Sequence, residues 1–181
     1  MSDRGAGAGA LPPGSTIGIL GGGQLGRMLA MAAARLGLKC HIYCPDPDSP
    51  AFDIAAARTV AAYEDRASLD AFARSVDVVT YEFENVDVAA AERLGSIVPV
   101  RPGPRALAVS QDRVTEKRFL RDLGIGTAPF FPVNDLGSLE AAVGAIGRPA
   151  VLKIRLGYFS PLHHITWSSQ CTPQSPMVPL A

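Results

Sequence analysis

The stretch STIGILGGGQLGR, residues 15–27, decides the fold of this chain. An apolar run rich in β-branched residues leads into glycines, and Gly21, Gly23 and Gly26 have the G-x-G-x-x-G spacing of a strand–turn–helix. Glycines let the chain turn tightly and let a ligand approach the backbone, and the N–H groups that open the following helix attract an anion. The stretch therefore predicts a loop that faces a phosphate, although glycines needed only for packing would leave the same pattern.

Strands and helices alternate downstream of this loop. Further strands are predicted at residues 38–44, 58–62, 76–83 and 97–100, and helices at residues 24–36, 51–57, 68–75 and 86–94. The first helix is expected to present one apolar face, made by Leu25, Met28, Leu29, Ala32 and Leu36. This alternation predicts an α/β fold, a Rossmann-like parallel sheet in strand order 3-2-1-4 with helices on both faces.

The composition of the chain excludes several classes of protein. Lysine plus arginine and aspartate plus glutamate each number 17, so the net charge is zero and no basic surface for nucleic acid is expected. No apolar run is long enough to span a bilayer. Cys40, Cys44 and Cys171 lack the spacing of metal ligands, which predicts reduced thiols in a cytoplasmic protein.

Two glutamates follow the strand predicted at residues 76–83. Glu82 and Glu84 are two positions apart, so on an extended chain their side chains point to one face. In a sheet ordered 3-2-1-4, this strand end and the glycine loop border the same crevice, where ligands of such folds bind. Amides suit a phosphate and carboxylates suit ribose hydroxyls, which predicts a ribonucleotide-like ligand. A solvated acidic strand end is the plain alternative.

A dinucleotide cofactor is a second interpretation of the glycine loop. An NAD(P)-dependent oxidoreductase of this fold has an acidic residue near the end of its second strand. Here Asp46 follows that strand within a proline-rich turn, which fits the pattern loosely.

A boundary is predicted at Arg101-Pro102-Gly103-Pro104, and a second set of elements follows it. Residues 105–123 are expected to be helical with a break near residues 111–112, and a further helix is expected at residues 138–146. Residues 149–154 are predicted to form a strand that carries Lys153.

Several motifs resemble the N-terminal part of the 5-(carboxyamino)imidazole ribonucleotide synthetases, which are members of the ATP-grasp superfamily. These are GGGQLGRM at residues 21–28, TYEFENV at residues 80–86, QDR at residues 111–113 and PAVLK at residues 149–153. They follow one another in the family's order from about residue 16 to residue 158, which is most of this chain but less than half of the family's length.

The resemblance implies an ATP-dependent carbon–nitrogen ligase of de novo purine biosynthesis that works in the cytoplasm. In that family ATP phosphorylates bicarbonate to carboxyphosphate, and the amine of aminoimidazole ribonucleotide attacks the activated carboxyl group. ATP and Mg2+ are the implied cofactors, and aminoimidazole ribonucleotide, bicarbonate and a second copy in a homodimer are the implied partners. A non-catalytic ribonucleotide-binding fragment stays open as an alternative.

The resemblance also implies which residues bind the ligands, and it places no magnesium ligand in this chain. The ATP-binding residues are expected to be Arg113, Lys153, Gly157 and Tyr158. The residues expected to contact the ribonucleotide are Gly23, Gln24, Leu25, Glu82 and Glu84. An arginine fork and a lysine point charge are both suited to phosphate oxygens.

The sequence departs from the family after Lys153. The family continues into a Gly-Tyr-Asp-Gly-Lys-Gly-Gln-like loop that closes over the ATP phosphates, whereas here Gly157-Tyr158 is followed by Phe159-Ser160-Pro161. Residues 159–181 carry no Asp, Glu, Lys or Arg, which indicates a foreign or frameshifted tail. We therefore expect this chain to be catalytically inactive alone. The expected organisation is a disordered leader at residues 1–14, a Rossmann-like pre-ATP-grasp domain at residues 15–103, the incomplete start of an ATP-grasp domain at residues 104–158, and the tail at residues 159–181.

Overall fold

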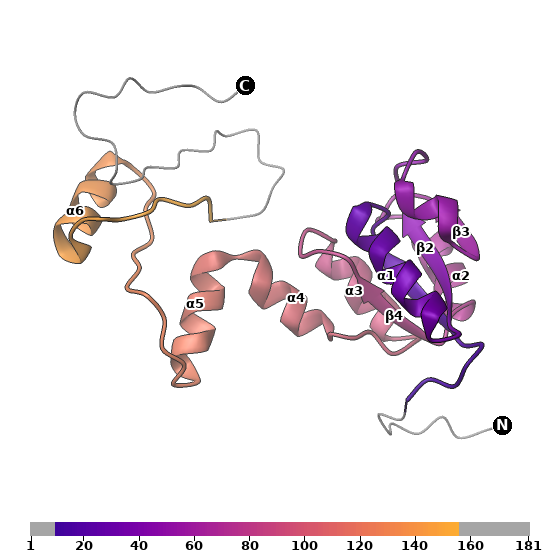
Figure 1. Cartoon of the computed structure of the whole chain (residues 1–181). Helices are drawn as coiled ribbons and strands as arrows, with labels where there is room; N and C mark the ends of the chain where they lie inside the picture. The colour runs from indigo at the N-terminus through magenta and orange to yellow at the C-terminus, as the bar shows by residue number, and fades with distance from the viewer. Residues whose placement is uncertain (1–9, 156–181) are drawn as a thin grey trace. The chain divides into compact units, whose positions relative to one another are not determined.

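The computed structural model describes residues 10–155 of the chain (Figure 1). The expectations for the tail, for Gly157 and Tyr158, and for most of the leader therefore lie outside the described residues. The chain divides into two compact units between Ala108 and Val109. Within the described part, no helix has the length and apolarity needed to cross a membrane.

The first unit is built on a four-stranded parallel sheet. Its strands are β1 (Thr16–Leu20), β2 (Lys39–Cys44), β3 (Ala57–Val60) and β4 (Val78–Tyr81). They lie in the order β3-β2-β1-β4, with Ile19 of β1 opposite Ile42 on one side and Thr80 on the other. The predicted strand order and the predicted α/β class are confirmed. Because β1 and β4 are neighbours, the glycine loop and the segment after β4 emerge at the same edge of the sheet.

Three helices connect the strands of this sheet, and two more follow its last strand. They are α1 (Gln24–Arg35), the 3-10 helix η1 (Pro50–Ile54), α2 (Arg66–Arg74), α3 (Val88–Gly95) and α4 (Pro104–Gln111), whose last residues lie beyond the division between the units. The helix α2 begins after Asp65, whose carboxylate accepts hydrogen bonds from the N–H groups of Ala67 and Ser68.

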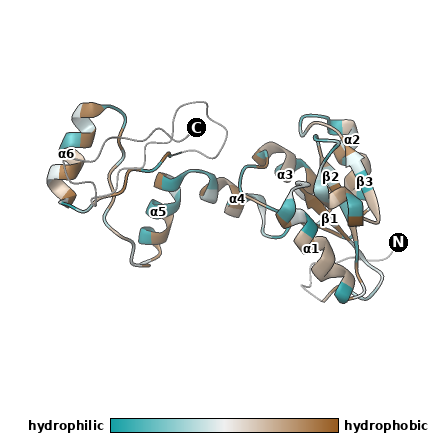
Figure 2. Ribbon diagram, turned by 45° about the horizontal axis from the view of Figure 1, so that its top comes forward, coloured by the Kyte–Doolittle hydropathy of each residue, from teal (hydrophilic) through white to brown (hydrophobic). Residues whose placement is uncertain are grey.

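Both faces of the sheet are covered, as the alternation of buried residues along the strands shows. Ile19 and Ile42 pack with residues of α1 and η1 in one apolar cluster. The next residues along the two strands, Leu20 and Tyr43, pack with α2, α3 and α4 in the other. Successive side chains of a strand point to opposite faces, so two separate cores are the expected result. In Figure 2 the strands of this unit carry the hydrophobic colour between their flanking helices.

The helix α1 is buried on a face that the sequence does not single out. The residues of α1 that are buried are small: Gly26, Ala30 and Ala33. The predicted apolar face is wrong as a core face, because its members are exposed, with Leu25 at 55% and Met28 at 63%. Small side chains let the helix lie close to the sheet, and this closeness turns the larger side chains toward solvent.

Several predicted elements differ in extent. The helix predicted at residues 51–57 is the short η1, and the strand predicted at residues 97–100 is reduced to one bridge between Val79 and Val100. The strand predicted to reach residue 83 ends at Tyr81, and the chain turns over residues 82–86. The N–H of Glu82 makes one more hydrogen bond to β1, to the carbonyl of Leu20 at 3.0 Å, before the chain turns toward α3.

The described part of the second unit contains two further helices, α5 (Arg113–Asp122) and α6 (Leu136–Ile146). Each begins after an aspartate that caps it, Asp112 for α5 and Asp135 for α6, and the predicted break near residues 111–112 is confirmed. The strand predicted at residues 149–154 is wrong, since this segment pairs with no neighbouring strand in the described part of the chain. A strand needs a neighbour to take its backbone hydrogen bonds. The predicted domain limits remain a prediction.

Candidate functional site

The glycine loop joins β1 to α1 at the carboxyl edge of the sheet. Gly21 has a φ of +103°, a conformation that favours glycine, and its N–H donates to the carbonyl of Tyr43 at 2.9 Å. Gly22 accepts a hydrogen bond from the N–H of Ala51 at 2.9 Å. Gly23 is the N-cap of α1 and offers no side chain to cap it. The open end of α1 therefore depends on a partner from elsewhere.

Glu82 supplies that partner. Its backbone N–H continues the pairing with β1 by donating to the carbonyl of Leu20 at 3.0 Å, which brings the side chain over the loop. One carboxylate oxygen accepts the N–H of Gly23 at 2.9 Å, and the other accepts the N–H of Gly26. A carboxylate at a helix N-terminus is stabilised by the helix dipole, by about 0.3–2 kcal/mol. The sequence predicts that the glycine loop and Glu82 both belong to the site, but it does not predict the hydrogen bonds between them.

The close fit of Glu82 explains why the loop is rich in glycine. A Cβ at Gly21 would lie 2.5 Å from Cγ of Glu82, and a Cβ at Gly23 would lie 2.9 Å from its Oε1. At Gly26 it would meet Oε2 of Glu82 at 2.7 Å and the carbonyl oxygen of Gly21 at 2.8 Å. All three glycines of the motif thus make room for one carboxylate of the same chain.

This arrangement changes which ligand groups the loop can take. The N–H groups of Gly23 and Gly26 already donate to Glu82, so an incoming anion would have to compete with a bound carboxylate. The remaining lone pairs of that carboxylate can accept hydrogen bonds from hydroxyl or amino groups. The geometry therefore favours a neutral, hydrogen-bond-donating part of a ligand, such as a ribose, at Glu82. The predicted contact between the loop and a phosphate stays a prediction.

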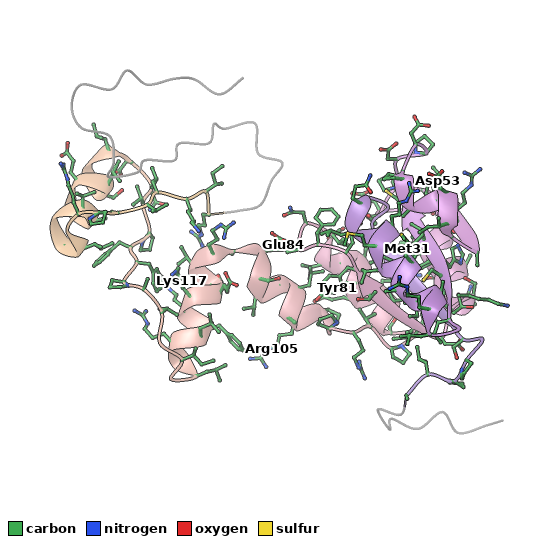
Figure 3. The ribbon with its side chains drawn as sticks, viewed as in Figure 1. Met31, Asp53, Tyr81, Glu84, Arg105 and Lys117 are labelled. Carbon is green, nitrogen blue, oxygen red and sulfur yellow. The ribbon has the colours of Figure 1, made fainter. Side chains whose placement is uncertain are left out.

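The other residues predicted to contact a ribonucleotide lie around the same loop. Gln24 and Leu25 open α1, and both are exposed. Glu84 is also exposed and lies on the turn after β4, where Figure 3 labels it together with Tyr81 at the strand end. Because β4 ends at Tyr81, strand alternation no longer places Glu82 and Glu84 on one face. The role of Glu84 stays a prediction.

Tyr63 is a residue near this site that the sequence analysis missed. Its ring stacks on that of Tyr43, with centroids 5.8 Å apart. Burial, followed by the charges of Cys44 and Glu82, holds the pKa of the Tyr63 hydroxyl above its usual range. The phenol therefore keeps its proton and can donate a hydrogen bond. Tyr63 could have been found from the sequence by its position on the loop after β3, because this loop lies at the same edge of the sheet as the glycine loop.

The two predicted ATP-binding cations belong to the second unit. Arg113 is the first residue of α5, and Lys153 lies on the segment that precedes Arg155; both side chains are exposed. The N–H of Arg113 donates to the carbonyl of Arg155 at 3.1 Å, so the two segments lie side by side. Their predicted contacts with ATP are not tested by this geometry. Among the described residues, no group of three or more His, Cys, Asp or Glu side chains gathers where a metal ion could be held.

The sheet, the glycine loop and the match to known sequences define the class of this protein. Residues 15–111 match the model of the ribonucleotide synthetase preATP-grasp domain, and the chain belongs to this family. Within it, the chain is similar to the N5-carboxyaminoimidazole ribonucleotide synthases, which confirms the predicted resemblance.

Three relatives illustrate the similarity. The N5-carboxyaminoimidazole ribonucleotide synthase of Brucella melitensis is 55% identical over 150 residues, which are 82% of this chain and 41% of the relative. The solved ADP complex of an N5-carboxyaminoimidazole ribonucleotide synthetase gives a TM-score of 0.78 at 36% identity, covering 88% of this chain and 42% of that one. The Aspergillus clavatus synthase, solved with ADP and 5-aminoimidazole ribonucleotide, gives 0.68 at 32% identity, covering 80% and 41%. The chain thus spans about two fifths of the length of these relatives.

Proposed function

We propose that this chain is the ribonucleotide-side part of an ATP-dependent carbon–nitrogen ligase of purine biosynthesis. The reaction would carboxylate the amine of aminoimidazole ribonucleotide, with bicarbonate as the carbon source and ATP as the activating reagent. The similar enzyme of Aspergillus clavatus was solved with ADP and with that ribonucleotide, which supports the choice of both ligands.

The single observation that carries the proposal is the placement of Glu82. Its carboxylate is held over the glycine loop at the edge shared by β1 and β4, where ligands of this fold bind. Held by two N–H groups, it is fixed in position and still has lone pairs to accept the ribose hydroxyls of a substrate. The residues proposed to contact the ribonucleotide are Gly23, Gln24, Leu25, Glu82 and Glu84.

Arg113 and Lys153 are proposed to bind the phosphates of ATP, together with Gly157 and Tyr158. A guanidinium can hold two phosphate oxygens at once, and an ammonium acts as a point charge, so the pair can spread over a polyphosphate. Mg2+ is proposed to arrive with the nucleotide. Phosphoryl transfer to bicarbonate depends on such positioning and charge stabilisation.

We also propose a homodimer and a cytoplasmic location. The exposed side chain of Met31 in α1 offers an apolar group that a second copy could cover. Figure 3 labels Met31 on this helix.

The alternative of an NAD(P)-dependent oxidoreductase is less well supported. A dinucleotide of such an enzyme places its pyrophosphate at the N–H groups of the glycine loop, and two of these donate to Glu82. Asp46, the acidic residue considered for the ribose, accepts the N–H of Asp48 at 3.0 Å within its own turn.

Calorimetric titration of the chain with aminoimidazole ribonucleotide tests the proposal. We expect binding, and we expect Glu82→Gln to weaken it about tenfold, because glutamine carries no charge and its amide nitrogen cannot accept one of the two loop N–H groups that hold the side chain in place. The matched control is Asp77→Asn. Asp77 accepts the N–H of Thr16 at 2.9 Å at the opposite end of the same pair of strands.

Equal affinities for wild type and Glu82→Gln would contradict the role of Glu82. Stronger binding of NADH than of the ribonucleotide would instead favour the oxidoreductase. Binding of the ribonucleotide without any turnover would agree with the non-catalytic fragment.

A further inference from the structure

In the second unit an ion pair joins Asp112, near the start of the unit, to Arg155, the last residue that the structure describes. The guanidinium of Arg155 donates to both carboxylate oxygens of Asp112, from Nε at 3.0 and 2.9 Å and from Nη2 at 2.7 Å. The same carboxylate accepts the N–H groups of Val114 at 2.9 Å and Thr115 at 3.3 Å, which caps α5. Asp112 therefore serves two partners, one local and one far along the chain.

This pair lies directly beside the two cations of the proposed ATP site. Arg113 follows Asp112, and its N–H donates to the carbonyl of Arg155 at 3.1 Å. Along residues 151–155 the side chains alternate between exposed and half-buried, so Lys153 and Arg155 share the exposed side of that segment. The backbone contact and the ion pair thus hold the segment that carries Lys153 against the start of α5.

Stability alone does not explain this double use of Asp112. The Arg155 side chain is 53% exposed and that of Asp112 is 16% exposed, so solvent screens the arginine end of this two-pronged pair and limits its contribution to the free energy of unfolding. A helix cap needs no second charge either, since Asp135 caps α6 through the N–H of Ser138. What the ion pair adds is a side-chain contact that, together with the hydrogen bond from the Arg113 N–H to the Arg155 carbonyl, fixes the register of the two segments.

We propose that Asp112 and Arg155 are positioning residues that set Arg113 and Lys153 beside each other, so that both reach the same nucleotide phosphates. The proposal rests on the proposed function of Arg113 and Lys153. Neither Asp112 nor Arg155 needs to touch the nucleotide. The guanidinium of Arg155 is occupied by the carboxylate of Asp112, whereas Arg113 and Lys153 are exposed.

The first test measures the register of the two segments without any nucleotide. Amide hydrogen exchange is followed by NMR in wild type and in Arg155→Met, which keeps a long side chain and removes the charge. We expect the Arg113 N–H to exchange roughly tenfold faster in the variant, because its acceptor is no longer held in place. Asp112→Asn should do the same while the cap survives, since asparagine is a good N-cap. Asp135→Asn is the matched control and should leave the Arg113 N–H unchanged.

The second test titrates the same proteins with MgADP. We expect Arg155→Met and Asp112→Asn to weaken MgADP binding about fivefold, the effect of a lost exposed ion pair of about 1 kcal/mol, and Arg155→Lys to restore part of it. Asp135→Asn should bind as wild type does. The variants Arg113→Ala and Lys153→Ala report separately on the proposed ATP contacts.

The outcomes separate the two proposals. If Arg113→Ala and Lys153→Ala weaken MgADP binding while Arg155→Met does not, the positioning role is overturned and the ATP contacts stand. If no protein binds MgADP, or if neither alanine variant changes its affinity, the assignment of the ATP contacts fails, and the positioning role, which presupposes them, fails with it. Unchanged exchange of the Arg113 N–H in Arg155→Met would overturn the positioning role whatever the titration shows.

Discussion

At the scale of single residues, His41 has the most constrained chemistry in the first unit. It lies in β2 with 9% of its surface exposed, and its ring meets the edge of Phe72 at 4.8 Å between centroids. Its Nδ1 is 2.9 Å from the hydroxyl of Ser75, and its Nε2 is 2.8 Å from that of Thr59. Because Ser75 already donates to the carbonyl of Phe72, Nδ1 donates to Ser75, and in the neutral imidazole Nε2 accepts from the hydroxyl of Thr59.

This pattern needs a neutral imidazole, which predicts a pH dependence of stability. Burial lowers the pKa of His41 below its ordinary value of 6.5. The folded state therefore binds fewer protons than the unfolded state, and the free energy of unfolding falls as the pH drops below about 6.5. We expect urea denaturation midpoints to decrease from pH 7 to pH 5 for this reason.

The variant His41→Gln tests this assignment. It should lower the free energy of unfolding by about 1 kcal/mol at pH 7, which corresponds to the loss of one hydrogen bond. The difference from wild type should be smaller at pH 5, because glutamine has no proton to gain. Asp65 and Asp135 have pKa values lowered by their hydrogen bonds, so their effects are expected in more acidic solution. An unchanged slope between pH 7 and pH 5 in His41→Gln would mean that other groups cause the decline.

Residue-level prediction from the sequence succeeded where residue type and position along the sheet agree. Glu82 was placed at the correct edge because strand order follows from the alternation of elements. Its contact with the N–H groups of Gly23 and Gly26 was not predicted, because this contact depends on β4 ending at Tyr81. The Asp112–Arg155 pair joins residues 43 positions apart, and pairing over such a separation leaves no local pattern.

At the scale of elements, the position of α1 was predicted correctly from the sequence, but the face that it buries was not. Its apolar spacing gave the correct position and length, and Gly37 ends it with a φ of +72°. The residues that are buried, however, are Gly26, Ala30 and Ala33, and the two alanines pack with residues of β1 and β2. Periodicity locates faces, and the distance at which a helix packs on a sheet decides which face is buried.

Two substitutions in α1 test this orientation through the free energy of unfolding. Changing a large exposed residue should matter little, and changing a small buried residue should matter more. Met28→Lys should change the free energy of unfolding by less than about 0.5 kcal/mol, because Met28 is 63% exposed. Ala33→Leu should cost about 1–3 kcal/mol, because Ala33 is 6% exposed and a larger side chain would push the helix from the sheet. Urea denaturation of both variants measures this, and the reverse order would show that α1 is turned the other way.

The segment at residues 149–154 shows a second limit of sequence patterns. Its apolar residues are typical of a strand, and the structure gives it no ladder within the described residues. A helix satisfies its own backbone hydrogen bonds, whereas a strand depends on a neighbour. Helices of the second unit could accordingly be predicted from the sequence alone, as α5 and α6 were.

At the scale of the whole molecule, the chain combines a sheet unit with two cores and a second unit of another character. The first is the part that matches the family model, over residues 15–111. The second exposes large apolar side chains, among them Leu123 at 60%, Phe131 at 51% and Val151 at 65%. In Figure 2 its helix α5 carries hydrophilic colours along much of its length.

We expect the 181-residue chain to show no ATP hydrolysis on its own. The reason lies in its sequence, which departs after Tyr158 from the loop that covers the ATP phosphates in the family it resembles. A phosphate-release assay with ATP, Mg2+, bicarbonate and aminoimidazole ribonucleotide measures this. Release stimulated by the ribonucleotide would contradict the expectation, and a relative of full length is the positive control.

Because Glu82 fits closely among Gly21, Gly23 and Gly26, the substitutions that can be tolerated at these four positions depend on one another. A side chain at Gly23 becomes tolerable only after position 82 has shrunk, so the order in which changes arise matters there. At Gly26 the carbonyl of Gly21, and at Gly21 the positive φ, oppose a side chain whatever stands at position 82. Grafting the glycine loop alone into another scaffold would carry across an unpaired helix end. Anyone who recombines such domains must therefore move the turn after β4 together with the turn after β1.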